Sequence, residues 1–585
     1  MPVASEKTMF NRHYRQELSY LRELAVEFSR VHPALAPRLG EQSPDPDVER
    51  LLEGVAFSTG LLRQKLEDEF PEIVHSLMDL IFPHYLRPIP STSIITFSPK
   101  PGLKETVRVP RGTSVASVPV EGTTCRFRTC SEVDVHPLRV TDARLVEQPG
   151  RAVQIVLDLE LTGIDLSAFA PRALRFFLGG NYAEATNLYL LLNRHVRGVI
   201  LRPREGGRAR TLAPGFLRPG GFSKQESLIP YPGQSFPGYR LVQEYFLLPQ
   251  KFLFMDLYGL NRWNDRGNGT AFQIIIVLKN PPLHLSGIRP ENFVLFATPI
   301  INIFEHSADP IQLDHRQAQY PVRPSGPNTD HYRVYSVDQV TGLVRGSVER
   351  KAYVPLELFS AHNAGRPVYH LVRRPSPLDR SARVFLTFPY AKWTGPPVDE
   401  TLSMGLSCTN AALPEKLQLG DVSQPTSSSP ELLEFRNLIP LTASVEPPLG
   451  SNALWLLLSH MSLNYLSLAN ARNLKELLRL YIFPEGRDKP KIAANEKRVN
   501  GIEEVRVSPA DRLVSGHMMR GQEIEMRVRQ DNFASTGDMF LFCSVLDYFL
   551  GVYASMNAFT RLKVLDTITG ETYLWPTRLG DTPLL

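Results

Sequence analysis

The sequence predicts an α+β chain of several domains: a helical N-terminal segment, β-rich middle domains and a mixed α/β C-terminal domain. The first ninety residues carry apolar side chains at helical spacing and no strand-like alternation. From Thr92 onward, apolar residues recur at every second position in short runs that lie between Gly and Pro turns. Beyond Gly420 helical patterns return. At 585 residues the chain is long enough for about three or four domains, and we place the boundaries at 1–90, 91–390 (two subdomains) and 391–585.

Two or three helices are expected at the start. Apolar residues recur every three or four positions between Thr8 and Arg30, until Pro33 and Pro37 end the pattern. A second helix begins near Asp47, a good N-cap residue, and Pro71 is expected to restart it. Their apolar stripes could pack on each other, which is the commoner arrangement, or on helices of other chains.

The middle region is predicted to hold short strands joined by Pro-rich connections. The most apolar stretch, Gly238–Leu260, is split by Pro249 into a helix and a short buried strand. A helix is expected over Asn181–Leu192, and loops over Arg202–Gly238 and Arg323–His331. The expected strands lie around Ile94–Phe97, Arg151–Leu161, Leu174–Phe177, Gln273–Leu278, Phe293–Ile303, Arg333–Val337, Val368–Val372 and Arg383–Phe388.

The C-terminal region mixes both periodicities. Gly420–Pro430 has the composition of a flexible loop. Alternation of apolar and polar residues predicts strands over Gly501–Val507 and Glu523–Arg529 and a terminal hairpin around the Thr569-Gly570 turn. The expected helices are Ala453–Ser462, Asn470–Tyr481 and Gly537–Ala554, the last of them strongly apolar.

Composition argues against several classes of protein. The 65 basic and 60 acidic residues leave a net charge of only +5, spread evenly, so nucleic acid is not an expected partner. Four cysteines in so long a chain indicate a reducing, cytoplasmic compartment. The N-terminus has no apolar core of a signal peptide. The uncharged stretch Pro447–Ala471 has polar residues on every face, so no direct membrane insertion is expected.

A search for catalytic and cofactor motifs finds none. The densest His/Asp cluster holds His306, Asp309, Asp314 and His315, and a polar loop is a simpler interpretation than a metal or acid–base site. Cys125 and Cys130 lack a second ligand pair at zinc spacing. We therefore predict no enzyme, no cofactor and no metal. Geometry cannot be assigned to carboxylate pairs from sequence, which leaves a β-rich carbohydrate-active enzyme open.

Several long segments carry a family resemblance. They occur in the order of the family and span nearly the whole chain: Asp45–Phe57, Phe82–Pro90, Gly238–Leu260, Thr298–Phe304, Leu457–Leu468 and Tyr553–Thr560. With these segments the chain resembles TssF (VasA/ImpG), the baseplate subunit of bacterial type VI secretion systems. Such proteins are similar to the baseplate wedge proteins of contractile phage tails.

The resemblance implies a structural role in the baseplate, which initiates assembly of the contractile sheath and tube. The implied partners are TssG, a second copy of the chain, TssK, TssE and the VgrG hub, around which wedges assemble. It also implies docking to the inner-membrane complex through the assembled baseplate. We hypothesise that the two N-terminal helices join an intersubunit bundle. The residues expected at that interface are Phe10, Tyr14, Leu18, Leu21, Phe28, Leu51, Leu52, Phe57 and Leu62.

Other interpretations remain open at this point. A wedge protein of another phage-tail-like particle would share the mechanics but have different neighbours. A secreted effector or binding module would require export. The type VI baseplate subunit is our leading interpretation, and gene context would separate it from the wedge of another particle.

Overall fold

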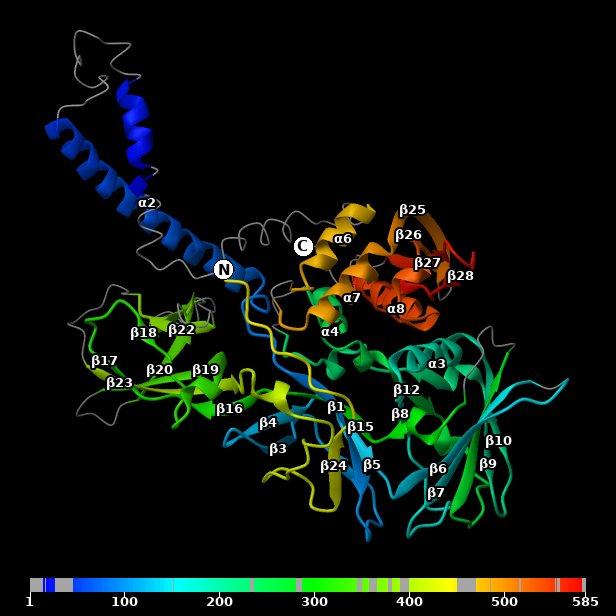
Figure 1. Cartoon of the computed structure of the whole chain (residues 1–585). Coiled ribbons are helices and arrows are strands. Elements are labelled where there is room, and N and C mark those ends of the chain that lie inside the picture. Colours follow the sequence, from blue (N-terminus) through cyan, green and yellow to red (C-terminus); the bar gives the residue numbers. More distant parts are fainter. Residues whose placement is uncertain are drawn as a thin grey trace. The chain divides into compact units, whose positions relative to one another are not determined.

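The structure is a computed structural model that describes most of the chain (Figure 1). The described residues are 14–15, 17–26, 46–150, 152–231, 236–279, 287–344, 350–356, 366–376, 381–389, 399–449, 470–483, 486–514, 517–552, 554 and 558–580, with backbone only at 48, 61–73, 80, 81 and 514. The chain divides into two compact units. Unit 1 comprises Met1–Leu80 with Pro448–Leu457, and unit 2 comprises Ile81–Pro447 with Leu458–Leu585.

The described N-terminal part of unit 1 is helical. Residues 14–15 and 17–26 lie in a short helix, and α2 runs from Pro46 to Ile81. The predicted restart at Pro71 is wrong, because α2 continues through this proline without a break. A proline removes one backbone hydrogen bond. The residues before it, Leu66-Glu67-Asp68-Glu69, include strong helix formers that sustain the helix up to that point.

Three sheets form the first part of unit 2 (Figure 1). Sheet 1 has the order β24 (Leu433–Asn437), β1 (Thr92–Pro99), β15 (Ala297–Ile301), β4 (Thr123–Thr129) and β3 (Ser114–Val120). Sheet 2 has the order β10 (Arg210–Leu212), β9 (Val196–Pro203), β13 (Ala271–Leu278), β7 (Gln154–Leu161) and β6 (Leu138–Val146). Sheet 3 has the order β11 (Leu217–Pro219), β12 (Phe254–Tyr258), β8 (Ala173–Phe177) and β14 (Val294–Leu295). A two-stranded ribbon of β2 (Val107–Val109) and β5 (Val133–Val135) accompanies them.

The strand predicted over Phe293–Ile303 is wrong as a single element. It is divided between β14 in sheet 3 and β15 in sheet 1. The break falls at Phe296, whose φ of +56° lies in the left-handed region. Such a backbone turn redirects the chain from one sheet to the next, and no hydrophobic alternation signals it in advance.

Sheet 4 is the largest. Its order is β16 (Phe304–Ser307), β23 (Glu400–Thr409), β19 (Arg333–Val344), β20 (Arg350–Pro355), β21 (Val368–Pro375), β22 (Ala382–Thr387) and β18 (Tyr320–Pro321), and β17 (Ile311–Leu313) also pairs with β23. Its buried residues form a separate hydrophobic cluster that includes Tyr369, Leu386, Leu402 and Leu406. Sheet 4 therefore has a core of its own.

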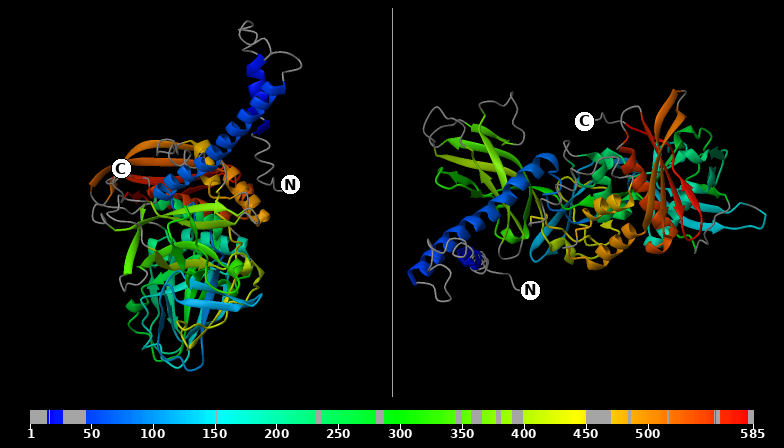
Figure 2. Two further views of the ribbon diagram at one scale, coloured as in Figure 1. Left: turned by 90° about the vertical axis from the view of Figure 1, so that its left-hand side faces the viewer. Right: turned by 90° about the horizontal axis from the view of Figure 1, so that it is seen from above.

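Among its described residues, the C-terminal part of unit 2 combines a sheet with three helices. Sheet 5 has the order β25 (Ile502–Val514), β26 (His517–Val528), β27 (Phe559–Asp566) and β28 (Thr572–Leu574), and β29 (Arg578–Leu579) pairs with β27. Figure 2 shows the β25–β26 hairpin in orange beside red β27, its parallel neighbour. The helices are α6 (Ala471–Arg479), α7 (Lys489–Asn500) and α8 (Thr536–Val552). The sequence analysis misses α7, because few apolar residues mark this helix of mainly charged and polar residues.

The most apolar stretch folds as predicted. It forms α4 (Pro237–Leu247), a short 3-10 turn from Pro249 and the buried strand β12. The helix α3 (Tyr182–Arg194) also confirms its prediction, with Asn181 as the N-cap whose side chain accepts a hydrogen bond from the Ala183 backbone N–H. Both α3 and α4 pack against α8. The expected helix at Ala453–Ser462 lies outside the described residues.

Two predicted loops are more ordered than expected. The stretch Arg202–Gly238 contains β10 and β11. The stretch Gly420–Pro430 is tied to β3 through a bridge between Gln424 and Ala116 and a hydrogen bond from the Ser114 N–H to the Ser428 hydroxyl. The predicted domain boundaries at 90 and 390 stay predictions. Strand pairing joins residues on both sides of the second one, since β24 pairs with β1 and β23 with β19.

Candidate partner interface

The helices of unit 1 leave apolar side chains exposed. Arg22 of the short helix pairs with Glu49 of α2, and Figure 1 draws this helix beside the N-terminal half of α2. On α2, Ala56 is fully buried, whereas Leu51 is 69% and Phe57 49% exposed. Further exposed apolar residues are Tyr20, Leu24, Val26, Val55 and Leu77. These helices carry more apolar surface than their contact with each other covers, which is typical of an interface with another chain.

The predicted interface residues divide into three groups. Tyr14, Leu18, Leu21 and Leu52 are half-buried, and Leu51 and Phe57 are exposed. Phe10 and Phe28 lie outside the described residues, and only the backbone of Leu62 is described. Their contact with partner chains stays a prediction.

A buried polar cluster joins four helices of unit 2, α3, α4, α7 and α8. Asp538 at the start of α8 is fully buried and accepts hydrogen bonds from Arg498 of α7 at 3.0 Å and from the Tyr182 hydroxyl of α3 at 2.7 Å. The Tyr245 hydroxyl of α4 donates to the same carboxylate at 3.3 Å. Burial raises the pKa of both tyrosines well above its usual value, so both remain hydrogen-bond donors. One carboxylate thus fixes the helices relative to one another.

A second buried charge cluster anchors α4. Glu244 is fully buried and pairs with Arg240 at 3.0 Å and with Lys251, which is also fully buried. It also accepts a hydrogen bond of 2.7 Å from the Leu228 backbone N–H. Burial lowers the pKa of Lys251, and the charge of Glu244 opposes that shift. The sequence analysis missed both clusters. The members of the Asp538 cluster lie far apart along the chain, and those of the Glu244 cluster are close in sequence but match no motif.

The candidate metal and acid–base residues lie in ordinary structural settings. The rings of His306 and Tyr332 stack with their centroids 4.7 Å apart, and the His306 Nε2 hydrogen-bonds with the Ser325 carbonyl at 2.7 Å. Asp314 accepts a hydrogen bond from the Tyr320 hydroxyl at 2.8 Å. Cys125 and Cys130 are buried, and burial raises the pKa of their thiols to about 11 and about 12. Among the described residues, no group of three or more His, Cys, Asp or Glu side chains is placed to hold a metal ion.

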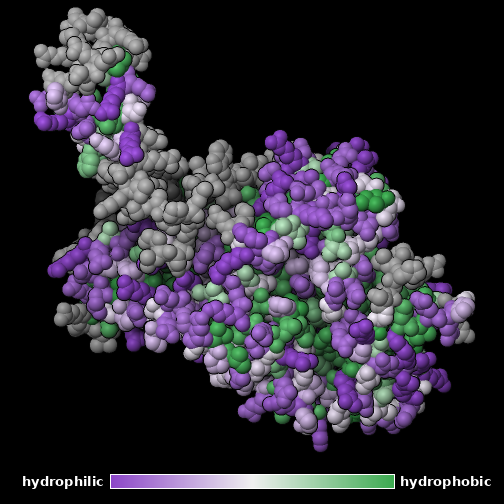
Figure 3. All heavy atoms as spheres, viewed as in Figure 1, coloured by the Kyte–Doolittle hydropathy of each residue, from purple (hydrophilic) through white to green (hydrophobic). Residues whose placement is uncertain are grey.

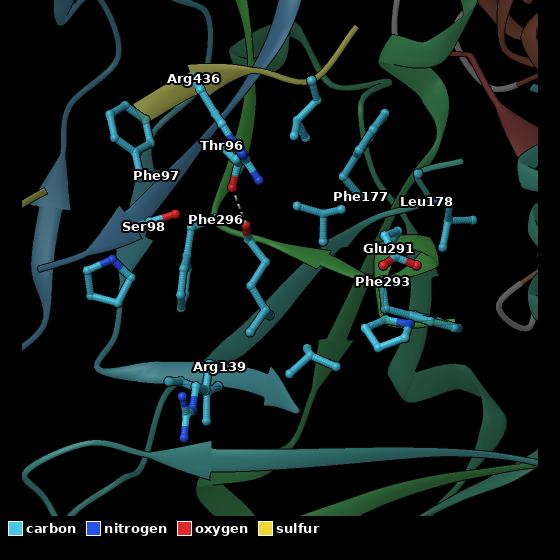
Figure 4. A pocket seen from close by; sticks show the side chains of 18 of the residues that line it. Thr96, Phe97, Ser98, Arg139, Phe177, Leu178, Glu291, Phe293, Phe296 and Arg436 are labelled. Atoms are coloured by element: carbon cyan, nitrogen blue, oxygen red, sulfur yellow. Dashed lines mark hydrogen bonds between the residues drawn. The ribbon is translucent and has the colours of Figure 1, made fainter. Parts of the chain in front are cut away.

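A large pocket lies where sheets 1, 2 and 3 meet, and we call it the three-sheet pocket. Its volume is about 820 Å³. It is lined by residues of β1, β6, β8, β14, β24 and α3 and of the segments beside them. Phe177 of β8 and the two residues that flank β14, Phe293 and Phe296, are among them. Figure 4 shows Arg436 of β24, Arg139 of β6 and Glu291, which precedes β14, around an apolar interior. The lining residues come from distant stretches of sequence, so no local pattern predicts the pocket.

Hydrophobic residues reach the surface near this pocket. Figure 3 shows them gathered around a hollow in the region where β1, β15 and β8 lie in Figure 1. Contiguous exposed apolar surface of this kind marks binding sites more often than does scattered exposure. No helix in the described part of the chain is long and apolar enough to cross a membrane.

Comparison with known proteins identifies the family. The sequence model described as "Type VI secretion system, TssF" matches residues 6–582. The chain belongs to the TssF family. The type VI secretion system component TssF1 of Pseudomonas aeruginosa is 31% identical over 98% of this chain and 99% of its own length. The predicted resemblance is therefore confirmed.

Solved structures from type VI secretion baseplates match this TssF-family chain as well. One, from a TssK–TssF–TssG baseplate subcomplex determined by cryo-electron microscopy, is 29% identical, with a TM-score of 0.77 over 92% of this chain and 99% of that chain. Another, from the baseplate complex of the type VI secretion system, is 26% identical, with a TM-score of 0.62 over 98% of this chain and 100% of that chain.

Proposed function

We propose that this TssF-family chain is a structural subunit of a type VI secretion baseplate that assembles with TssG and TssK. The observation that carries the proposal is the match over nearly the whole length to chains from two solved baseplates. The similarity covers both the β-rich body and the helical start, so the proposed role draws on the whole chain. The role is structural rather than catalytic.

In finer detail, two copies of the chain join one TssG to form a wedge. Wedges encircle the VgrG hub, TssE links them toward the sheath, and this assembly initiates the contractile sheath and tube. The chain is cytoplasmic and reaches the inner-membrane complex through the assembled baseplate. The exposed apolar residues of the N-terminal helices support an intersubunit bundle, because clustered exposed apolar surface is typical of sites that contact another chain.

The test is the native mass of the chain co-expressed with the TssG and TssK of the same gene cluster. We expect a stable complex with two copies of this chain per TssG. Expression without TssG is the control, and it should abolish the species with this stoichiometry. A monodisperse monomer that binds neither TssG nor TssK would overturn the assembly role. A complex with one copy per TssG would overturn only the proposed wedge.

A further inference from the structure

We propose that the three-sheet pocket binds an extended, apolar segment of another baseplate subunit, and that a carboxylate of this segment meets Arg436. This inference rests on the proposed function, since it assigns a specific binding site to the assembled protein. It concerns unit 2 alone and does not involve the N-terminal helices.

The size and lining of the pocket suit a short stretch of polypeptide. Its volume of about 820 Å³ lies within the range of roughly 300–1,000 Å³ that is typical of ligand pockets. Phe177, Phe293 and Phe296 line it together with Leu178 and Leu253. An apolar lining of this kind favours apolar side chains over a purely polar ligand.

The walls are held in place by hydrogen bonds. The Thr96 hydroxyl of β1 donates to the Leu295 carbonyl of β14 at 2.9 Å, a bond that Figure 4 draws. The Asn292 side chain donates to the Gly179 carbonyl at 3.1 Å. Sheets 1 and 3 are therefore joined at the pocket, and the cavity exists before any ligand arrives. A preformed site loses less entropy on binding.

Edge strands contribute to the lining of the pocket, which favours an extended ligand. In the described part of the chain, β24, β6 and β14 are each the last strand of their sheet. All three contribute lining residues. The outer side of a last strand can accept another strand, and peptide recognition commonly uses this pairing, with pockets for alternate side chains.

The charges of the lining favour a carboxylate on the ligand. Three cations, Lys100, Arg139 and Arg436, line the pocket, against one anion, Glu291. Arg139 pairs with Glu160 at 2.7 Å, and the Lys100 ammonium donates to the Glu431 carbonyl at 2.9 Å. Arg436 is exposed, and no ion pair is found for it among the described residues. A guanidinium beside an apolar surface is a good partner for a carboxylate.

The decisive experiment places a photo-crosslinking amino acid at Ser98 in the full chain, co-expressed with the other baseplate proteins. Ser98 is exposed and lines the pocket, so the probe fits without disturbing the core. We expect a light-dependent crosslink to a different subunit, at a segment with apolar residues and at least one Asp or Glu. The same probe at Ser403, an exposed strand residue of sheet 4, is the control.

Two variants measure the contribution of the pocket. Ser98→Trp should obstruct the pocket and Arg436→Glu should repel the carboxylate, and each should weaken association with the crosslinked subunit at least tenfold. The matched controls are Ser403→Trp and Arg197→Glu, both on exposed strand positions outside the pocket, and they should bind as wild type. Unchanged melting temperatures would confirm that the variants fold.

The outcomes separate this inference from the proposed function. If the wild-type chain does not co-purify with TssG or TssK, the proposed function fails. If the complex forms but Ser98 yields no crosslink, or if both pocket variants bind as wild type, the pocket inference is overturned. A crosslink to a second copy of this chain, or a small acidic lipid retained in the pocket by native mass, would also overturn it.

Discussion

The helices α8 and α2 show two different uses of apolar sequence. Fourteen of the 17 residues of α8 are buried, from Gly537 to Gly551. Its polar side chains are paired: Asp538 with Arg498, Asp547 with Arg578, and Ser544 with the Trp575 indole N–H. By contrast, α2 leaves Leu51, Val55, Phe57 and Leu77 exposed. The two helices therefore differ in how far the described chain covers their apolar side chains.

This difference separates regions of the chain that cover their own apolar side chains from regions that leave them exposed. Around α8, every buried charge that we describe has a partner, as a helix enclosed by its own chain requires. Around the first part of α2, the exposed residues flank the buried stripe of Ala56 and Gly60. Substitutions in α8 should therefore affect folding, and substitutions at the exposed positions of α2 should affect association.

The largest effect is expected for Asp538→Asn. The substitution keeps the shape of the side chain but leaves Arg498 buried without a counter-charge. Breaking a buried pair in this way costs about 3–5 kcal/mol of unfolding free energy, which urea denaturation would measure. Asp531→Asn is the control, because its ion pair with Arg529 is about half exposed and should contribute less than about 1 kcal/mol. Equal losses in the two variants would contradict the central role of Asp538.

Local periodicity predicted the elements whose buried residues recur at regular spacing or form one continuous apolar run. It predicted α3 with its Asn181 cap, the α4–β12 stretch and the terminal hairpin. It failed where tertiary contacts decide the outcome. The division at Phe296 depends on a left-handed backbone between two sheets, and α7 is a charged helix held partly through buried Asn495 and Arg498.

Clusters and pockets built from residues far apart along the chain could not be predicted from the sequence, for a related reason. The Asp538 cluster brings in Tyr182 from 356, Tyr245 from 293 and Arg498 from 40 residues away along the chain. The three-sheet pocket brings Thr96, Glu291 and Arg436 to one cavity. A single sequence carries no signal for such proximity. The family resemblance could be predicted, because it rests on long ordered segments.

A pair of glycine substitutions sharpens the comparison at the level of packing. A Cβ at Gly537 would lie 2.2 Å from the Thr186 backbone, so Gly537→Ala must separate α8 from α3. We expect a loss of about 1–3 kcal/mol, as for other overpacked sites. A Cβ at Gly54 of α2 meets nothing within 4 Å. Gly54→Ala should therefore stabilise this helix by about 0.5–1 kcal/mol.

Hydrogen exchange read by mass spectrometry would follow both changes in the same experiment. Amides of residues 46–60 should exchange more slowly in Gly54→Ala, and amides of α8 should exchange faster in Gly537→Ala. If Gly54→Ala instead destabilised α2, the space around this glycine would be occupied in solution, and the contrast between the two helices would fail.

The smallest effect on folding, and the most specific one, is expected for Leu51→Asp combined with Val55→Asp. Both side chains are exposed and lie one helical turn apart. The unfolding free energy of the isolated chain should change by less than about 0.5 kcal/mol, as for other surface substitutions. Association with TssG should weaken at least tenfold, which corresponds to about 1.4 kcal/mol. Titration of purified TssG by calorimetry would measure it. Arg50→Asp changes the net charge by the same amount at a neighbouring exposed position, so binding that falls equally in both variants would indicate a charge effect and would contradict an apolar interface on α2.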